Sequence, residues 1–203
     1  MLLSNLSRIP TMNSSVPRPI TAPLFLALLL TAACTADEQA QAGAGVQAPA
    51  QPTLEAATSL GVRNARMPAP ALVTAGQITE EQFDGLVAAG FENFISLRLA
   101  DEDGAGWEEG HAPSEGVSFT RLPVTGGAGL TRETAEELAW LLDSAEGGTV
   151  LYCGSSNRVG ALMALKAFWV DGAEPQEALD LGLAAGMTRL EPTVRGMLGL
   201  SEN

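Results

Sequence analysis

The sequence contains very few of the residues that bind metals or carry acid–base chemistry. Its 203 residues include one histidine, two cysteines and one tyrosine. His111, Cys34 and Cys153 cannot supply the ligands of a structural zinc site, and the carboxylates do not have the spacing of a calcium loop. A G-x-S-x-G sequence is also missing, which disfavours a serine hydrolase. The sequence therefore predicts no metal and no cofactor, and it leaves cysteine as the candidate nucleophile.

Positive charge is scarce as well. Eleven lysines and arginines stand against 24 acidic residues, giving a formal net charge of −13. All of the acidic residues follow Cys34, whereas two of the arginines, Arg8 and Arg18, precede it. Because so acidic a chain repels phosphate backbones and anionic lipids, nucleic acid and charged membrane surfaces are disfavoured as partners. A small anionic substrate would have to be held by a local site.

The apolar run of the N-terminal region is too short to span a membrane as a mature helix. It covers residues 24–30, follows the basic leader, and ends in small residues before Cys34. This arrangement resembles a bacterial lipoprotein signal of residues 1–34, with Cys34 lipidated. Thr31 departs from the usual Leu, Val or Ile, so an ordinary secretory signal stays open, as does a start at Met12. We expect export to the periplasmic side of the bacterial cell envelope, with membrane contact only through the lipid.

The segment that follows the signal is made mostly of Ala, Gln, Gly, Pro and Thr. Residues 35–58 contain almost no bulky apolar side chains, so we expect a disordered tether. Residues 59–203 are then enough for one domain with a sizeable core.

Apolar runs and helical patterns alternate along this domain. The runs at 71–75, 94–97, 117–122 and 149–152 are typical of buried strands, and an acidic, glycine-rich loop is expected at 101–116. Helical patterns occupy 79–90, 130–146, 159–170, 174–185 and 192–198. The alternation predicts a single α/β domain with a mainly parallel sheet of about four strands, flanked by helices. Ligands of such sheets bind beyond the carboxyl ends of the strands.

The segment between the last predicted strand and the following helix carries the clearest chemical signal. It runs Tyr152-Cys153-Gly154-Ser155-Ser156-Asn157-Arg158. Loop amides and a helix N-terminus hold anions, and the same setting favours the thiolate form of a cysteine. Arg158 could add a planar fork for a tetrahedral oxyanion. A buried cysteine before an ordinary strand–helix turn is the alternative.

Four segments together resemble a known bacterial group: Ala75–Thr79, Ile95–Arg98, Leu122–Thr125 and Tyr152–Leu162. They are similar, in the same order, to the phosphatase-like domain of beta-lactamase-hydrolase-like proteins, a branch of the cysteine-dependent, dual-specificity-type phosphatases. The resemblance covers about residues 70–200 and implies a cysteine-phosphatase-like fold. It also implies a nucleophile, Cys153, and an anion-binding set: Gly154, Ser155, Ser156, Asn157 and Arg158, with Arg98 lining the mouth. Pairing of Arg98 with Asp101 or Glu102 is the alternative for that residue.

The sequence departs from a working phosphatase at four places. Four residues rather than five separate the cysteine from the arginine, Tyr152 replaces a histidine, and Val159 replaces a hydroxyl residue. Glycines fill positions 126 and 127, where the general acid is usually found. The carboxylates that could substitute as acids are Asp101, Asp103 and Glu133.

The tighter loop leaves three functions open. Cysteine-dependent hydrolysis of a phosphoester is the first. Four-residue spacing also resembles rhodanese-type sulfurtransferases, so sulfur transfer or persulfide handling at Cys153 is the second. An inactive anion-binding domain is the third. In the two catalytic hypotheses the partner is a small anionic substrate, either a phosphoester or a carrier of sulfane sulfur.

Overall fold

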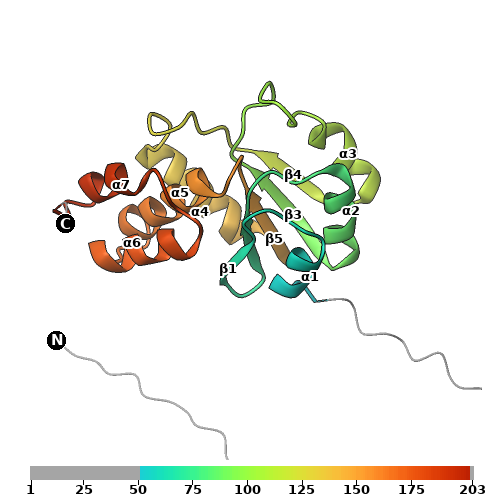
Figure 1. Cartoon of the computed structure of the whole chain (residues 1–203), viewed down its shortest axis with the longest axis horizontal. Helices are drawn as coiled ribbons and strands as arrows, with labels where there is room; N and C mark the ends of the chain where they lie inside the picture. The colour runs from blue at the N-terminus through green and yellow to red at the C-terminus, as the bar shows by residue number, and fades with distance from the viewer. Residues whose placement is uncertain (1–50, 202–203) are drawn as a thin grey trace, which may run out of the picture. The chain divides into compact units, whose positions relative to one another are not determined.

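The computed structural model describes residues 51–201, so the predictions for the signal peptide, for Cys34 and for most of the tether lie outside the described residues. The described part contains a five-stranded sheet in the order β1-β2-β5-β3-β4 (Figure 1). Its strands are β1 (Arg66–Ala69), β2 (Leu72–Ala75), β3 (Phe91–Ser96), β4 (Ser118–Arg121) and β5 (Gly148–Tyr152). All neighbouring pairs are parallel except β1 with β2. The predicted α/β class with a mainly parallel sheet is confirmed.

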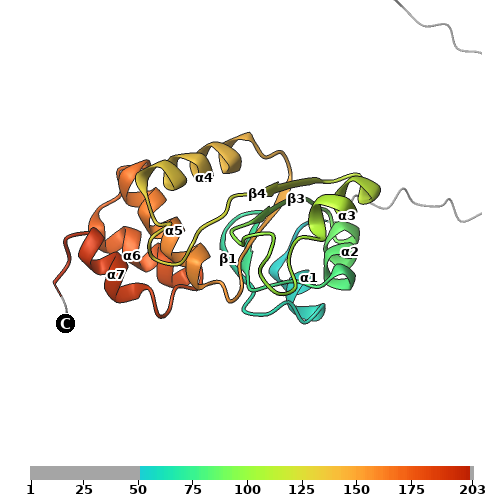
Figure 2. The ribbon, with the colours of Figure 1, turned by 90° about the horizontal axis from the view of Figure 1, so that it is seen from above.

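Seven helices are found among the described residues. They are α1 (Leu54–Ser59), α2 (Glu80–Ala88), α3 (Glu108–Glu115), α4 (Arg132–Ser144), α5 (Asn157–Trp169), α6 (Pro175–Ala184) and α7 (Glu191–Met197). α4, α5, α6 and α7 lie on one side of the sheet, and α1, α2 and α3 lie on the other (Figures 1 and 2).

The central strand β5 shows why two helical layers form. All five of its residues are buried, and alternate side chains point to opposite faces of the sheet. Leu151 and Cys153 belong to the hydrophobic cluster under α4–α7, whereas Val150 and Tyr152 belong to the cluster under α1–α3. The period of two therefore places the cysteine on the same face as α5.

Local sequence signals fix the starts of α2 and α4. The Thr79 hydroxyl accepts a hydrogen bond from the Gln82 amide at 3.2 Å, and the Gln82 side chain accepts one from the Thr79 amide at 3.1 Å. Thr131 and Thr134 form the same reciprocal capping box at α4. These contacts satisfy amide donors that an uncapped helix start leaves free, and they confirm both predicted starts within two residues.

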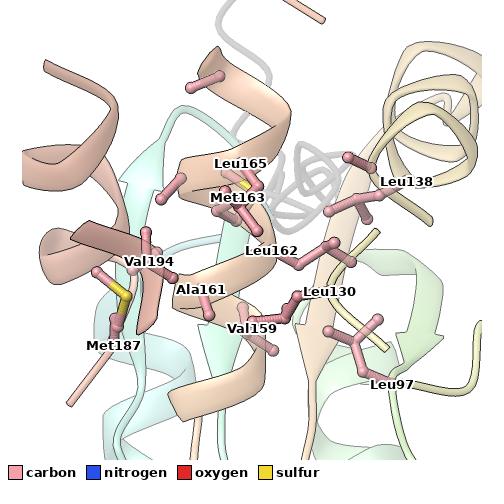
Figure 3. Packing of buried hydrophobic residues seen from close by; sticks show 14 of the residues in the cluster. Leu97, Leu130, Leu138, Val159, Ala161, Leu162, Met163, Leu165, Met187 and Val194 are labelled. Carbon is pink, nitrogen blue, oxygen red and sulfur yellow. The ribbon is translucent and has the colours of Figure 1, made fainter. Parts of the chain in front are cut away.

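Helix α5 is the centre of its layer and crosses α6 closely. A Cβ atom on Gly160 would lie 2.2 Å from the Met187 amide nitrogen and 2.4 Å from the Gly182 carbonyl oxygen. Only glycine allows this approach. Figure 3 shows the side chains of Val159 and Leu162 in the buried cluster that also contains Leu130. Helix α5 is therefore buried on nearly all sides.

Two expectations about the chain's irregular parts are wrong. The tether was expected to reach residue 58, but α1 begins at Leu54, is capped by the Thr53 hydroxyl, and buries Ala57 completely. The loop expected at 101–116 contains α3, in which Ala112 is buried and Pro113 lies inside the helix. In both places one buried alanine packs a polar segment onto the domain, and composition alone gives no sign of that tertiary contact.

The first strand was also missed. β1 is a four-residue edge strand that contains Pro68 and pairs antiparallel with β2. Proline is compatible with an edge strand because one side of that strand has no ladder partner. Short length and proline together hid this strand, so the sheet has five strands and not about four.

Candidate active site

The cysteine loop begins where β5 ends, at the carboxyl edge of the parallel sheet. The Cys153 amide still donates to the Ala75 carbonyl of β2 at 3.2 Å, and α5 starts only four residues later, at Asn157. The loop therefore lies between the central strand and the central helix. This is the place where open α/β sheets bind their ligands.

Ser156 makes the short connection possible. Its backbone adopts the left-handed conformation (φ 67°, ψ −9°), and the next residue is already helical. Alternation between left- and right-handed backbone turns successive N–H groups to one side and creates an anion-binding concavity. The Ser156 hydroxyl points away from the cavity lining and donates to the Ala185 carbonyl at 2.9 Å. Ser156 thus shapes the loop through its backbone, and its side chain fixes that shape.

The loop's carbonyl groups are held from outside. The Gln77 amide donates to the Gly154 carbonyl at 3.4 Å, and the Asn64 side-chain amide donates to the Ser155 carbonyl at 3.1 Å. Within residues 51–201, none of the hydrogen bonds uses the N–H of Gly154 or Ser155. Since buried or half-buried amides are nearly always paired, these donors are suited to an incoming anion.

Cys153 lies at the floor of a cavity at the carboxyl edge of the sheet. The side chain is free of disulfide bonding within the described part of the chain and only 1% exposed. The cavity has a volume of about 560 Å³. Its lining contains three arginines and no carboxylate: Arg63, Gly126, Cys153, Gly154, Ser155, Asn157, Arg158, Arg189 and Leu190. This surface is therefore locally positive on a strongly acidic chain.

Arg158 is fixed on one side by a carboxylate and on the other by carbonyl groups. Its two terminal nitrogens donate to the two oxygens of Glu102, both at 2.7 Å, and Nη1 also donates to the Val124 carbonyl at 2.9 Å. The hydrogen bond that Arg158 donates to Glu102 is the main reason why the pKa of Arg158 is raised, and the nearby Cys153 sulfur raises it further. The same pair lowers the pKa of Glu102 to about 2. Arg158 is thus oriented beside the sulfur before any anion arrives.

Arg98 does not lie where the resemblance placed it. It is 7% exposed and is absent from the cavity lining. Its guanidinium donates to Glu102 at 3.0 Å, to the Gln77 side chain at 2.5 Å and to the Asp103 carbonyl at 2.8 Å. The expectation that Arg98 lines the mouth is therefore wrong. The alternative pairing with Glu102 is what the structure contains, in a buried setting.

The three substitute acids are not brought to the cavity. Asp101, Asp103 and Glu133 are exposed, and none of them belongs to the cavity lining. The pKa of Glu133 is lowered by a hydrogen bond from its own backbone amide and by the Thr131 hydroxyl, so that carboxyl holds a proton less readily than usual. Among the described residues, no carboxylate lines the cavity near Gly126, where the general acid is expected.

The two other departures of the loop have structural reasons. Tyr152 points to the opposite face of the sheet, where its hydroxyl donates to the fully buried Glu108 at 2.9 Å. Glu108 also accepts from Arg121 at 2.9 Å, so the strand before the cysteine is anchored from behind. Val159 is completely buried, and Figure 3 shows it beside Leu130, within the apolar cluster. Neither side chain can give a proton or a hydroxyl to a ligand in the cavity.

One group of possible metal ligands lies elsewhere, on α2 and α3. The ligand atoms of Asp84, His111 and Glu115 lie within 4.8 Å of one another. The His111 ring is hydrogen-bonded to Asp84 at 2.6 Å, and this bond raises the pKa of the imidazole. The sequence argument against metal ligands did not foresee this cluster, although the hydrogen bond already accounts for the position of the histidine.

Arg63 and Arg189 are site residues that the sequence does not reveal, and Glu102, expected only as a possible partner of Arg98, also pairs with Arg158. Arg63 precedes the first strand, Arg189 lies between the last two helices, and Glu102 lies after β3. Nothing in their local sequence sets them apart from other charged loop residues. Only the packing of distant segments around the cysteine loop reveals them.

Sequence comparisons add nothing to this assignment, because no family model and no curated protein matches the chain. Solved structures do match. A DUF442 protein from Shewanella putrefaciens CN-32, named as a phosphatase candidate, has a TM-score of 0.52 and 18% identity over 72% of this chain and 99% of its own. A phosphatase candidate from Neisseria meningitidis Z2491 has a TM-score of 0.55 and 18% identity, over 64% of this chain and 96% of its own.

A third match holds a ligand. TpbA of P. aeruginosa, as a cysteine-to-serine variant in complex with phosphotyrosine, has a TM-score of 0.51 and 18% identity, over 74% of this chain and 91% of its own. Identities this low establish the fold and not the activity. The shared architecture and the cysteine loop at its carboxyl edge agree with the phosphatase-like part of the sequence resemblance. Residues 51–201 form a domain with the cysteine-phosphatase-like fold.

Proposed function

We propose that the protein is a cysteine-dependent phosphatase-like hydrolase that acts on a small phosphoester. The observation that carries the proposal is the position of Cys153 at the floor of a cavity lined by three arginines and no carboxylate. A dianionic phosphoryl group matches such a surface in charge, and the unpaired loop amides match its oxygens. The phosphotyrosine held by TpbA, a protein of the same fold, supports a phosphoester as the ligand class.

The proposed reaction has two displacements at phosphorus. The Cys153 thiolate attacks, a sulfur–phosphorus bond forms, and the bond to the leaving oxygen breaks. Water then attacks phosphorus, the sulfur–phosphorus bond breaks, and inorganic phosphate leaves with the thiolate restored. Arg158 and the loop amides stabilise the charge that grows on the equatorial oxygens, which is where fixed donors contribute most to rate.

The missing acid shapes this chemistry. A general acid commonly contributes about 10²–10⁴-fold by protonating the leaving oxygen. With glycine at 126 and no carboxylate in the lining, the leaving group has to depart as an anion or take its proton from water. We therefore infer a slow enzyme that favours phenolic or other stable leaving groups.

Sulfur transfer is the second candidate, and two observations favour it. Four residues separate the cysteine from the arginine, and persulfide chemistry needs no acid at the place that Gly126 occupies. In this reaction the thiolate attacks the outer sulfur of thiosulfate, a sulfur–sulfur bond forms, and sulfite leaves. The product is a persulfide on Cys153, which cyanide would convert to thiocyanate with return of the thiolate.

One experiment separates these functions. Wild-type protein and Cys153→Ser are assayed on an aryl phosphate and, separately, on thiosulfate with cyanide. The proposal expects phosphate release by the wild type and none above background by Cys153→Ser. Thiocyanate formation with background phosphate release would select sulfur transfer, and no turnover on either substrate would select an anion-binding domain.

Export is part of the proposal. We propose that residues 1–33 are removed, that Cys34 carries the lipid as the new N-terminus, and that the domain works in the periplasm of a bacterial envelope. The described residues contain no helix long and apolar enough to cross a membrane. Several acyl chains on one cysteine would give stable attachment, which a single chain does not. Mass spectrometry of the purified protein tests this: an unmodified N-terminus beyond Cys34 would contradict lipid anchoring.

A further inference from the structure

Two arginines that line the cavity form no side-chain hydrogen bond or ion pair within the described part of the chain. Arg63, between α1 and β1, and Arg189, between α6 and α7, both line the cavity that contains Cys153. Both residues are exposed, and within residues 51–201 neither guanidinium forms a hydrogen bond or an ion pair. Arg158, in contrast, shares both of its terminal nitrogens with Glu102. The uncompensated positive charge of the cavity therefore comes from Arg63 and Arg189.

The backbone at Arg63 is attached to the cysteine loop. The Gly76 amide donates to the Arg63 carbonyl at 2.7 Å, and the next residue, Asn64, donates its side-chain amide to the Ser155 carbonyl at 3.1 Å. Asn64 has a left-handed backbone with φ 54°. A Cβ on Gly76 would lie 3.2 Å from the Arg63 carbonyl oxygen and 3.3 Å from that of Gly154. This close packing fixes where the Arg63 side chain starts relative to the loop.

The backbone at Arg189 is attached to the same loop from the other direction. The Asn157 side-chain oxygen accepts hydrogen bonds from the Thr188 amide at 2.8 Å, the Thr188 hydroxyl at 3.1 Å and the Leu190 amide at 3.2 Å. The residues before and after Arg189 are therefore both held. Asn157, predicted as an anion ligand, uses its side-chain oxygen to position this second segment.

The charges and the size of the cavity fit more than one anionic group. The loop amides and Arg158 are enough to hold one phosphoryl group, and Glu102 already offsets the charge of Arg158. A volume of about 560 Å³ exceeds what one such group fills and lies in the range of sites for whole small molecules. In a chain of net charge −13, two unpaired arginines attached to one loop are a local exception to the charge of the whole.

We propose that Arg63 and Arg189 form a second anion subsite, and that the substrate carries another phosphate or carboxylate group besides the one held over Cys153. The proposal names a substrate class for the same cavity and so rests on the proposed function for what happens to the first group. Binding of the second group requires no turnover. Specificity then comes from a doubly anionic ligand, and simple monophosphates bind weakly.

Calorimetry with phosphonates, which are not hydrolysed, tests the subsite directly. The full chain is titrated with methylphosphonate and with bisphosphonates whose two groups are joined by one to four methylenes. We expect at least one bisphosphonate to bind about tenfold or more tighter than methylphosphonate, since two more charge-assisted contacts form. Equal affinity for methylphosphonate and for every bisphosphonate, or no binding at all, overturns the proposal.

Matched variants assign the effect to the two side chains. Arg63→Ala and Arg189→Ala should each reduce the preference for the bisphosphonate by about three- to tenfold. The lower end corresponds to a fully exposed ion pair, and the upper end to a pair that the cavity partly shields from water. Arg66→Ala removes a neighbouring exposed arginine that does not line the cavity, so it should leave the preference unchanged. An equal loss in Arg66→Ala, or a preference that survives the double variant, overturns the assignment.

The same titration in Cys153→Ser separates this proposal from the proposed hydrolysis. The bisphosphonate preference should persist there although turnover is lost. If the wild type proves inactive on every phosphoester but keeps the preference, the hydrolysis fails and the subsite stands. If hydrolysis occurs without any preference for doubly anionic ligands, the subsite fails and the hydrolysis stands.

Discussion

Arg158 brings a positive charge to the cysteine loop in a fixed orientation. Glu102 holds its guanidinium by two hydrogen bonds of 2.7 Å, and the Val124 carbonyl holds the edge at 2.9 Å. Such a bidentate pair fixes a plane as well as a charge. Little reorganisation is then needed when a phosphoryl group forms its trigonal transition state beside the sulfur. Glu102 is thus a positioning residue that reaches the reaction only through Arg158.

Replacing Arg158 should cost rate more than binding. For Arg158→Ala we expect a loss of about 10²–10³-fold in kcat on an aryl phosphate, because one oriented donor to a developing oxyanion is worth that much. Arg158→Lys should recover little, since an ammonium cannot form the fork. Steady-state kinetics measure both variants. A loss confined to KM would mean that Arg158 only attracts the substrate.

The pH dependence of stability gives a second test at Glu102. Its pKa is lowered from 4.5 to about 2, first by the hydrogen bond from Arg158, so the folded state favours the ionised carboxylate. The resulting stability is present above the ordinary value and is lost as pH falls through the folded pKa. The Tm difference between wild type and Glu102→Gln should therefore shrink between pH 5 and pH 2 (about the interval between the two pKa values). A difference that stays constant would contradict the ion pair.

Leaving-group dependence tests the absence of an acid. Without protonation of the departing oxygen, negative charge accumulates there, so rate should fall steeply as the pKa of the leaving alcohol rises. A series of substituted phenyl phosphates measures this slope for kcat/KM. Asp101→Asn, Asp103→Asn and Glu133→Gln, made singly, should leave the slope unchanged. A shallow slope that steepens in one variant would identify that carboxyl as the acid.

At the scale of elements, the close crossing of α5 and α6 determines how near the segment after α6 lies to the cysteine loop. α5 begins at the loop, and the backbone of α6 lies against Gly160. Any residue larger than glycine at 160 would push α6, and with it residues 185–190, away from the loop. The segment that carries Arg189 is therefore positioned by the contact of Gly160 with α6 as well as by the hydrogen bonds of Asn157.

Two glycine substitutions separate this packing from helix propensity. Gly160→Ala should destabilise the domain by about 1–3 kcal/mol or more, because the added carbon meets backbone atoms that cannot rotate away. Gly110→Ala, in α3, meets nothing within 4 Å and should stabilise by about 0.5–1 kcal/mol through helix propensity. Denaturant unfolding measures both. Equal effects of the two substitutions would mean that the close crossing is not maintained in solution.

Helices and central strands were predictable because their signals are local. The capping boxes at Thr79 and Thr131 and the apolar run before Cys153 each act within a few residues. β1 and α3 were missed because their sequences are weak in isolation and are stabilised by neighbours. For the same reason the cysteine loop could be predicted, whereas Arg63 and Arg189 could not, since distant segments bring them to the cavity. The pairing of Glu102 with Arg158 is equally invisible in the local sequence.

At the scale of the whole molecule, the folded domain starts before the boundary that composition suggested. Ala57 is completely buried in the cluster under α1–α3, and Pro52 lies close to Gly148 at the start of β5. Residues 52–58 therefore belong to the domain. This affects any attempt to produce the domain by itself.

Truncation tests the boundary. A chain that starts at Gln51 should unfold at a higher temperature than one that starts at Ser59, because the shorter chain loses α1 and exposes the surface that Ala57 covers. We expect a difference of several degrees, since about 1 kcal/mol shifts Tm by about 2–8 °C in domains of this size. Thermal unfolding followed by circular dichroism measures it. Identical unfolding temperatures for the two chains would mean that the folded domain begins after residue 58.

The two asparagine contacts of the cysteine loop join parts of the chain that are remote in sequence. Asn64 and Ser155 are 91 positions apart, and Asn157 and Thr188 are 31 apart, yet both pairs meet where the cysteine loop runs into α5. A site assembled from both ends of a domain has no independent existence as a peptide or a subdomain. Its loss should coincide with cooperative unfolding of the whole, and any ligand that fills it will raise the melting temperature of the entire domain.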